Sequence, residues 1–141
     1  MCFAAESIEE KVLLCSLLYY NKHKATEEVF HMFSYKSLKS GTDIRGVASE
    51  GGGAPVNLTD EVVERIAGGF LIWCEKHLEK PAAGLKIAVG HDSRISADRI
   101  SAALCRAFTP CGVQVLDCGL ASTPSMFMAT LELPCDCAVQ I

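Results

Sequence analysis

Two short polar segments of the sequence carry residue types that could act on a phosphoryl group. The first runs from Gly41 to Ala48 and places Asp43 and Arg45 in a strand-like stretch flanked by glycines. A planar guanidinium in such a place can donate parallel hydrogen bonds to a pair of phosphoryl oxygens. A surface ion pair between Arg45 and Asp43 is the alternative interpretation, and the residue pattern by itself supports both.

The second segment, His91 to Ser96, leads from an expected strand into an expected helix. Backbone N–H groups and the helix dipole make the start of a helix suited to an anion. In the alternative interpretation, Asp92 and Arg94 pair with each other and fix the loop, while Ser96 caps the helix. The residues alone favour this local pairing, and they give His91 no role of its own.

The sequence contains no complete set of catalytic or metal-binding residues. It has no serine–histidine–aspartate set, no paired carboxylates and no glycine-rich phosphate loop of the G-x-x-x-x-G-K or G-x-G-x-x-G type. It has 8 cysteines but no signal peptide, so we expect reduced thiols rather than a disulfide framework. The close pair Cys135 and Cys137 has the spacing of one strand face and not of a zinc knuckle, so we expect no metal site.

Alternating helix and strand patterns begin at residue 59. Thr59 is expected to cap a helix, because Asp60 and Glu61 in the first turn suit the positive end of the helix dipole. Strands are expected at residues 86–90, at 113–118 and from 135 onward, with helices starting after Ser96 and Ser122. The residues expected to form the buried stripes of the first two helices are Val63, Ile66, Ala67, Phe70, Cys74, Leu78, Ile100, Ala103, Leu104, Ala107 and Phe108.

This order of elements predicts an α/β fold, a three-layer α/β/α domain with a mostly parallel or mixed sheet. Ligands of such folds bind beyond the carboxyl ends of the strands. We therefore expect residues 90–96 and 119–123 to lie together at that edge of the sheet.

Composition narrows the classes of function. The chain has 141 residues, 50% of them apolar and 21% charged, with a net charge of −4, which is typical of a soluble globular domain. Scattered Lys and Arg exclude a nonspecific nucleic-acid partner, and short apolar stretches exclude a membrane span. The acidic N-terminal region argues against a transit peptide, so we expect a cytoplasmic location, with a plastid as the alternative.

The two ends of the chain differ from its middle. Residues 1–34 have helix-like composition but no motif, and we interpret them as a leader of uncertain structure. Residues 137–141 have the composition of a strand interior, with no turn or polar tail after them. This ending suggests a fragment of a longer protein.

Three motifs in order carry a resemblance to a known family. They are GTDIRGVA at 41–48, AVGHDSRIS at 88–96, and CGVQVLDCGL at 111–120 followed by Ser122-Thr123-Pro124. Together they resemble the start of the α-D-phosphohexomutases, which include phosphomannomutase and phosphoglucomutase. The resemblance implies that residues 35–141 are part of domain I, an α/β/α domain. It also implies that the catalytic serine, which is phosphorylated, lies shortly beyond Ile141.

The activity implied by the resemblance is the interconversion of hexose 1-phosphate and hexose 6-phosphate, with glucose and/or mannose as the sugar. It is an isomerase reaction in which phosphoserine exchanges its phosphoryl group with the substrate, a hexose phosphate. Mg²⁺ and hexose 1,6-bisphosphate are the implied cofactors, bound mostly by residues outside this chain. No nucleic-acid or membrane partner is implied, and the oligomeric state does not follow from the sequence.

The resemblance also assigns roles to individual residues. Arg45 matches an arginine close to the phosphoserine and is expected to steady phosphoryl charge. Asp43, Asp92 and Arg94 are expected to support the active-site loop, and His91 stands where an arginine is common in the family. We expect the chain alone to be inactive, and the alternative is a noncatalytic binding or regulatory protein.

Overall fold

The computed structural model describes residues 35–41 and 43–141. The expected leader, residues 1–34, and Thr42 of the first motif lie outside the described residues. The described elements are, in chain order, η1 (Tyr35–Leu38), β1 (Lys39–Ser40), β2 (Asp43–Ile44), α2 (Asp60–Leu78), η2 (Ala82–Gly84), β3 (Lys86–His91), α3 (Ala97–Phe108), η3 (Thr109–Cys111), β4 (Gln114–Leu120), α4 (Thr123–Glu132) and β5 (Cys137–Gln140).

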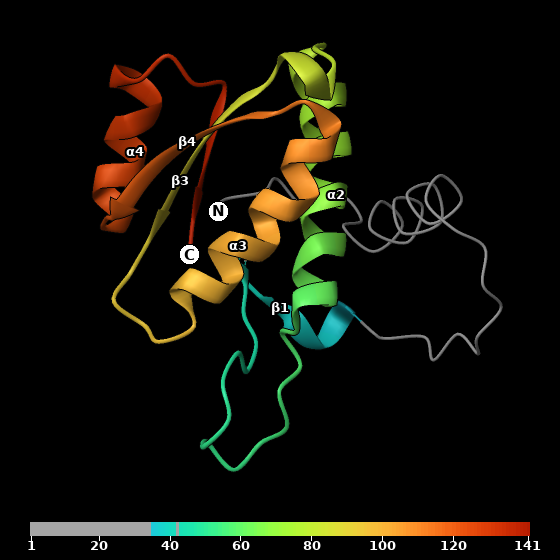
Figure 1. Cartoon of the computed structure of the whole chain (residues 1–141), viewed down its shortest axis with the longest axis vertical. Coiled ribbons are helices and arrows are strands. Elements are labelled where there is room, and N and C mark those ends of the chain that lie inside the picture. Colours follow the sequence, from blue (N-terminus) through green and yellow to red (C-terminus); the bar gives the residue numbers. More distant parts are fainter. Residues whose placement is uncertain (1–34, 42) are drawn as a thin grey trace, which may run out of the picture.

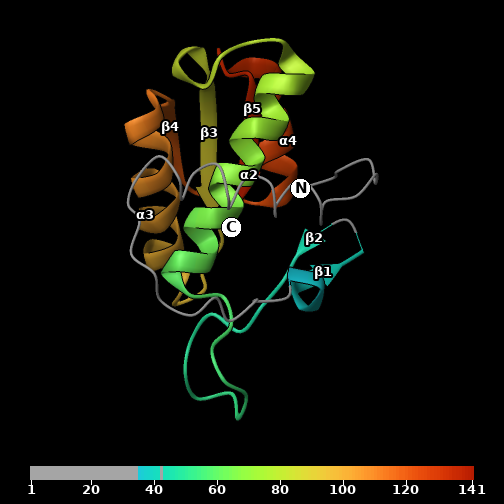
Figure 2. The ribbon, with the colours of Figure 1, turned by 90° about the vertical axis from the view of Figure 1, so that its right-hand side faces the viewer.

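The main sheet is parallel and has the strand order β4-β3-β5. The chain passes from β3 to β4 through α3 and then returns across β3 to β5 through α4. Because crossovers between parallel strands are right-handed, reversing the direction of travel places the two connecting helices on opposite faces of the sheet. Figure 1 shows α4 on one side of the strands and α2 with α3 on the other, and in the turned view of Figure 2 α2 lies in front of β5 and α4. This arrangement confirms the predicted α/β/α fold.

Beside this sheet, β1 and β2 form a separate antiparallel pair. They belong to the segment that precedes α2, and Figure 2 shows them near the amino-terminal end of that helix. None of the helices within residues 35–41 and 43–141 is long and apolar enough to cross a lipid bilayer.

The hydrophobic core lies between the sheet and the α2–α3 layer. The Thr59 hydroxyl accepts a hydrogen bond from the Val62 N–H at 3.3 Å, so Thr59 caps α2 as predicted. Phe108 is completely buried, with its ring centroid 6.3 Å from that of Phe70. The core cluster consists of Val63, Ala67, Phe70, Leu71, Cys74, Leu85, Ile87, Val89, Ile100, Ala103, Leu104, Ala107, Phe108, Val113 and Val139.

The predicted stripe of α3 is confirmed, but that of α2 is wrong at Leu78, which is exposed. Ile66 is half-buried, while Val62 and Leu71 are buried although they were not expected to be. The reason is that α2 packs against α3 and also shares the core cluster with strand residues such as Ile87 and Val139, so its apolar face is wider than a single stripe. Leu78 is the last helical residue and is followed by the left-handed Glu79.

Two predicted strand boundaries are also wrong. The strand expected at 113–118 runs from Gln114 to Leu120. The last strand begins at Cys137 and not at Cys135, because the Cys135 N–H bonds the Leu133 carbonyl at 2.8 Å in a turn. The two thiols therefore do not share a strand face.

Candidate functional site

Three chain segments meet at the carboxyl ends of the parallel strands. The Ala121 N–H donates to the His91 carbonyl at 2.8 Å, which joins the loop after β4 to the end of β3. The Ile141 N–H donates to the Gly90 carbonyl at 2.9 Å, and the Asp92 N–H donates to the Ile141 carbonyl at 2.8 Å. The expectation that residues 90–96 and 119–123 lie together is confirmed.

Gly90 allows α4 to lie close to this edge. A Cβ atom at Gly90 would stand 2.4 Å from the Met126 sulfur and 3.0 Å from the Ala121 Cβ. Real Cβ contacts are essentially never as short as the first of these, so a side chain here would force the Met126 side chain to move. The glycine thus leaves room for Met126 of α4 against the end of β3.

Asp92 and Arg94 form a local pair on the β3–α3 loop. The Asp92 carboxylate accepts a hydrogen bond from the Arg94 backbone N–H at 3.0 Å and forms an ion pair with the Arg94 Nε at 3.1 Å. The Arg94 side chain is nevertheless 82% exposed. The local pairing predicted from the sequence is present, and the guanidinium still faces solvent.

The predicted capping role of Ser96 is wrong. Its side chain makes no capping hydrogen bond, and its backbone is already right-handed helical, with φ −86° and ψ −7°. A capping residue normally has extended backbone, which aims its oxygen at the first free N–H groups of the helix. Here the Ala97 N–H instead bonds the Arg94 carbonyl at 3.0 Å, so the loop itself supplies the first turn.

Arg45 follows β2 and pairs with Asp43 at 2.9 Å. Its backbone N–H donates to the Leu38 carbonyl at 2.8 Å, which anchors the residue. The Arg45 side chain is 71% exposed, so the ion pair contributes little to folding and leaves guanidinium donors facing solvent. The surface ion pair with Asp43 is therefore present, and it is compatible with contact between Arg45 and an anion.

The segment after Arg45 is held by close backbone packing. The Val47 N–H donates to the Asn57 Oδ1 at 2.7 Å, and the Asn57 and Leu58 N–H groups donate to the Val47 carbonyl at 3.0 and 3.1 Å. A Cβ atom at Gly46 would lie 2.7 Å from the Asn57 Oδ1. This close approach requires glycine next to the candidate arginine.

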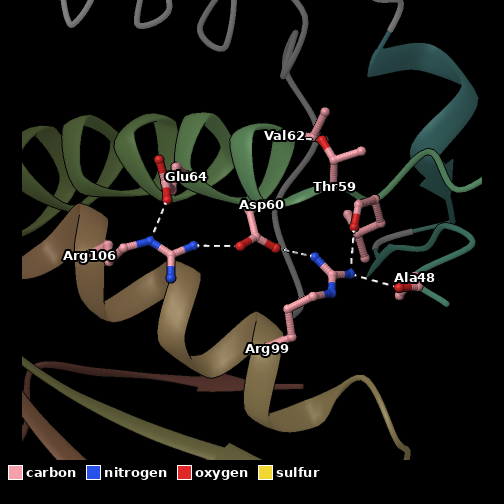
Figure 3. Close-up of polar contacts among 8 residues, drawn as sticks. Ala48, Thr59, Asp60, Val62, Glu64, Arg99 and Arg106 are labelled. Atoms are coloured by element: carbon pink, nitrogen blue, oxygen red, sulfur yellow. Dashed lines mark hydrogen bonds and ion pairs between the residues drawn. The ribbon is translucent and has the colours of Figure 1, made fainter.

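A charged network between α2 and α3 links this segment to the rest of the domain (Figure 3). Asp60 accepts hydrogen bonds from Arg99 and, at 2.7 Å, from Arg106, which also donates to Glu64 at 2.8 Å. Arg99 additionally donates to the Ala48 and Leu58 carbonyls. The hydrogen bond from Arg99, together with that from Arg106, lowers the pKa of Asp60 below its usual value.

Sequence reasoning missed this network, because Asp60 was interpreted only as a favourable charge at the start of a helix. A signal was available in the spacing of the charges. Asp60 and Glu64 stand four positions apart on one helix, and Arg99 and Arg106 stand seven positions apart on the next, so each pair lies on one face.

Comparison with known proteins identifies the family. The family model "Phosphoglucomutase/phosphomannomutase, alpha/beta/alpha domain I" matches residues 36–141. The chain belongs to this family. The match covers the whole of the three-layer domain described above and all of the candidate site residues.

Among curated phosphohexomutases, the chain is similar to the phosphoglucosamine mutase of Alkaliphilus metalliredigens, with 35% identity over 104 residues, or 72% of this chain and 20% of the relative. The phosphoglucosamine mutase of Thermotoga neapolitana is 35% identical over 91 residues, 64% of this chain and 18% of the relative. The phosphoglucosamine mutase of Clostridioides difficile is 33% identical over 104 residues, which are 72% of this chain and 20% of the relative. The chain thus spans about a fifth of the length of these relatives, and no solved structure matches it.

The described part of this phosphohexomutase domain does not form a metal site. Within residues 35–41 and 43–141, no group of three or more His, Cys, Asp or Glu side chains could hold a metal ion.

Two of the cysteines are in contact with each other, and a third bonds the backbone. The Cys74 and Cys137 sulfurs are 3.7 Å apart across the α2–β5 contact, and the Cys135 thiol donates to the Ala129 carbonyl at 3.6 Å. The hydrogen bond between the first two lowers the pKa of Cys137 and raises that of Cys74, which is also buried. Burial raises the pKa of Cys135.

Proposed function

We propose that the protein containing this chain is a phosphohexomutase that interconverts hexose 1-phosphate and hexose 6-phosphate through a phosphoserine. The observation that carries the proposal is the family match over residues 36–141, which includes every candidate site residue. The exposed Arg45 and the Asp92–Arg94 loop support it. Both belong to segments at the end of the molecule where the parallel strands finish (Figure 1).

In this reaction a free hydroxyl of the hexose phosphate bonds to the phosphorus of the phosphoserine as the serine O–P bond breaks. The hydroxyl proton ends on the serine oxygen, and a bisphosphate forms. After the bisphosphate turns, the serine hydroxyl takes the other phosphoryl group, and its proton ends on the sugar oxygen that is released. The protein must stabilise the charge on the transferred phosphoryl oxygens. Arg45 is suited to this because its guanidinium is exposed and permanently charged. The backbone N–H of Arg45 also bonds the Leu38 carbonyl, which anchors the residue.

Asp43 would hold the Arg45 guanidinium in place between turnovers, since the pair is 2.9 Å apart and only one residue separates them. Asp92 and Arg94 would brace the end of β5. The Asp92 N–H already bonds the Ile141 carbonyl, and the catalytic serine is proposed to follow shortly after Ile141. These three residues are therefore proposed as supports of the active-site loop.

The substrate proposal includes three sugars. Glucose and mannose phosphates follow from the resemblance, and a glucosamine phosphate is added because the similar curated proteins are named phosphoglucosamine mutases. Mg²⁺ and hexose 1,6-bisphosphate remain proposed cofactors. Because the described residues form no metal site, no step assigned to this chain runs through the metal.

A mutase assay on the full-length protein tests the proposal. We expect conversion of at least one of glucosamine 1-phosphate, glucose 1-phosphate and mannose 1-phosphate to its 6-phosphate, with Mg²⁺ and the matching bisphosphate present. The 141-residue chain is the control and is expected to be inactive. Absence of conversion of all three sugars by the full-length protein would contradict the proposal and favour a noncatalytic role.

A further inference from the structure

Arg99 is the one residue of the α2–α3 network that also bonds the backbone of the segment following β2. It stands in the first turn of α3 and reaches three groups. Its guanidinium donates to the Asp60 carboxylate, to the Ala48 carbonyl at 2.8 Å and to the Leu58 carbonyl at 2.8 Å. Figure 3 shows the side chain extending from α3 between α2 and the segment that carries Ala48.

The two carbonyls are the two ends of the loop 48–58. Val47, which directly precedes this loop, is bonded to both Asn57 and Leu58 at its other end. By holding both ends, Arg99 sets the position of Val47 relative to α3, and Val47 lies two residues after Arg45. On its other side, α3 directly follows the loop of Asp92 and Arg94.

We propose that Arg99 is a positioning residue for the mutase reaction. It holds the Arg45 segment in a fixed position relative to the β3–α3 loop. The inference rests on the proposed function, because it assigns Arg45 a place beside the phosphoryl group. Arg99 itself touches no reacting atom in this proposal. Its effect passes through the backbone from Ala48 to Arg45.

The chemistry of the three contacts requires arginine. A guanidinium is planar and presents several N–H donors in a fixed fork, so one side chain serves a carboxylate and two carbonyls at once. A lysine keeps the charge beside Asp60 but concentrates its donors on one nitrogen. Arg99→Lys is therefore the variant that preserves the ion pair and loses the fixed geometry.

Arg106 supplies a matched control. It also lies on α3 and bonds Asp60, but its other partner is Glu64 of α2 and not the 48–58 loop. Substitution of Arg106 removes a comparable ion pair from the same network without releasing the backbone next to Arg45.

The experiment compares Arg99→Lys, Arg99→Met and Arg106→Met in the full-length protein by mutase kinetics and by amide hydrogen exchange. Misplacement of a catalytic group by about 1 Å costs about a hundredfold in rate. We accordingly expect both Arg99 variants to lower kcat by about tenfold or more, with little change in KM. Amide hydrogen exchange at residues 45–48 and 57–58 should become faster in both Arg99 variants. Arg106→Met should match the wild type in kcat and in the exchange rates of these residues.

Two results would overturn the proposal. One is unchanged exchange at residues 45–48 and 57–58 in Arg99→Lys, which would show that Arg99 does not hold the segment. The other is faster exchange with unchanged kcat, which would show that holding it has no bearing on catalysis. Failure of the proposed function is distinguishable from both, because it removes mutase activity from the wild-type protein, while the exchange comparison can still be made.

Discussion

The arginines of the site loops and those of the α2–α3 layer have different partners and surroundings. Arg45 and Arg94 pair with aspartates two residues away, and their side chains are 71% and 82% exposed. The Arg99 side chain is 34% exposed, and its three partners lie 39, 41 and 51 positions away in the sequence. The loop arginines are thus fixed by local pairs, and Arg99 joins separate parts of the fold.

This difference indicates that the loops and the α2–α3 layer of the domain have different roles. The exposed pairs contribute little to folding because water screens them, so their charges are available to a ligand. The α2–α3 layer combines a buried apolar core with a charged network at its edge, and it determines where the loops lie. Substitutions of the buried core residues of the layer should therefore mainly change stability, and substitutions of the exposed loop arginines should mainly change activity.

The largest expected effect on stability is in the core of the layer. Phe108→Ala should lower the free energy of unfolding by about 3–5 kcal/mol, because it leaves a cavity beside Phe70 in a fully buried position. Chemical denaturation of the full-length protein measures it. Arg94→Ala, in the loop region, is the control and should change the same quantity by less than about 0.5 kcal/mol. Equal losses in the two variants would break the division between layer and loops.

A smaller effect is expected where the loop segment packs most tightly. Gly46→Ala should destabilise the protein by about 1–3 kcal/mol, because the added Cβ would lie 2.7 Å from the Asn57 Oδ1 and 2.9 Å from the Leu38 Cδ2. Gly52→Ala is the matched control in the same segment, since nothing lies within 4 Å of its added Cβ. Thermal unfolding of both variants tests this expectation. A Gly46→Ala protein as stable as Gly52→Ala would show that the segment is not held closely.

Much of this division was predictable from the sequence. The α3 stripe, the Thr59 cap, the α/β/α layers and both local arginine–aspartate pairs depend on residues that are near one another in the chain. The contacts of Arg99 depend instead on how α2 and α3 pack. The spacing of the charges places each pair on one face of its helix, but it does not indicate that the two faces meet or that Arg99 reaches the Ala48 and Leu58 carbonyls. Ser96 and Cys135 were misjudged for a different reason, because hydrogen bonds within their loops determine the local backbone. The Ala97 N–H bonds the Arg94 carbonyl at 3.0 Å, and the Cys135 N–H bonds the Leu133 carbonyl at 2.8 Å.

The smallest expected effect is a pH dependence of the network. Hydrogen bonds from Arg99 and Arg106 lower the folded-state pKa of Asp60 below the usual 3.8. The stabilisation from Asp60 is therefore present above pH 3.8 and is lost as the pH falls through the lower folded-state pKa. Denaturation of the wild type and of Asp60→Asn at several pH values should show a stability difference that shrinks in acid. A difference that stays constant across this range would contradict the assignment.

The central claim is that Arg45 serves phosphoryl transfer and not folding. The direct test measures the proposed mutase kcat and the free energy of unfolding of Arg45→Ala in the full-length protein. We predict that kcat falls by about a hundredfold or more, because a donor to the transferred phosphoryl group is lost, while the free energy of unfolding changes by less than about 0.5 kcal/mol. A kcat within about twofold of the wild type would contradict the claim.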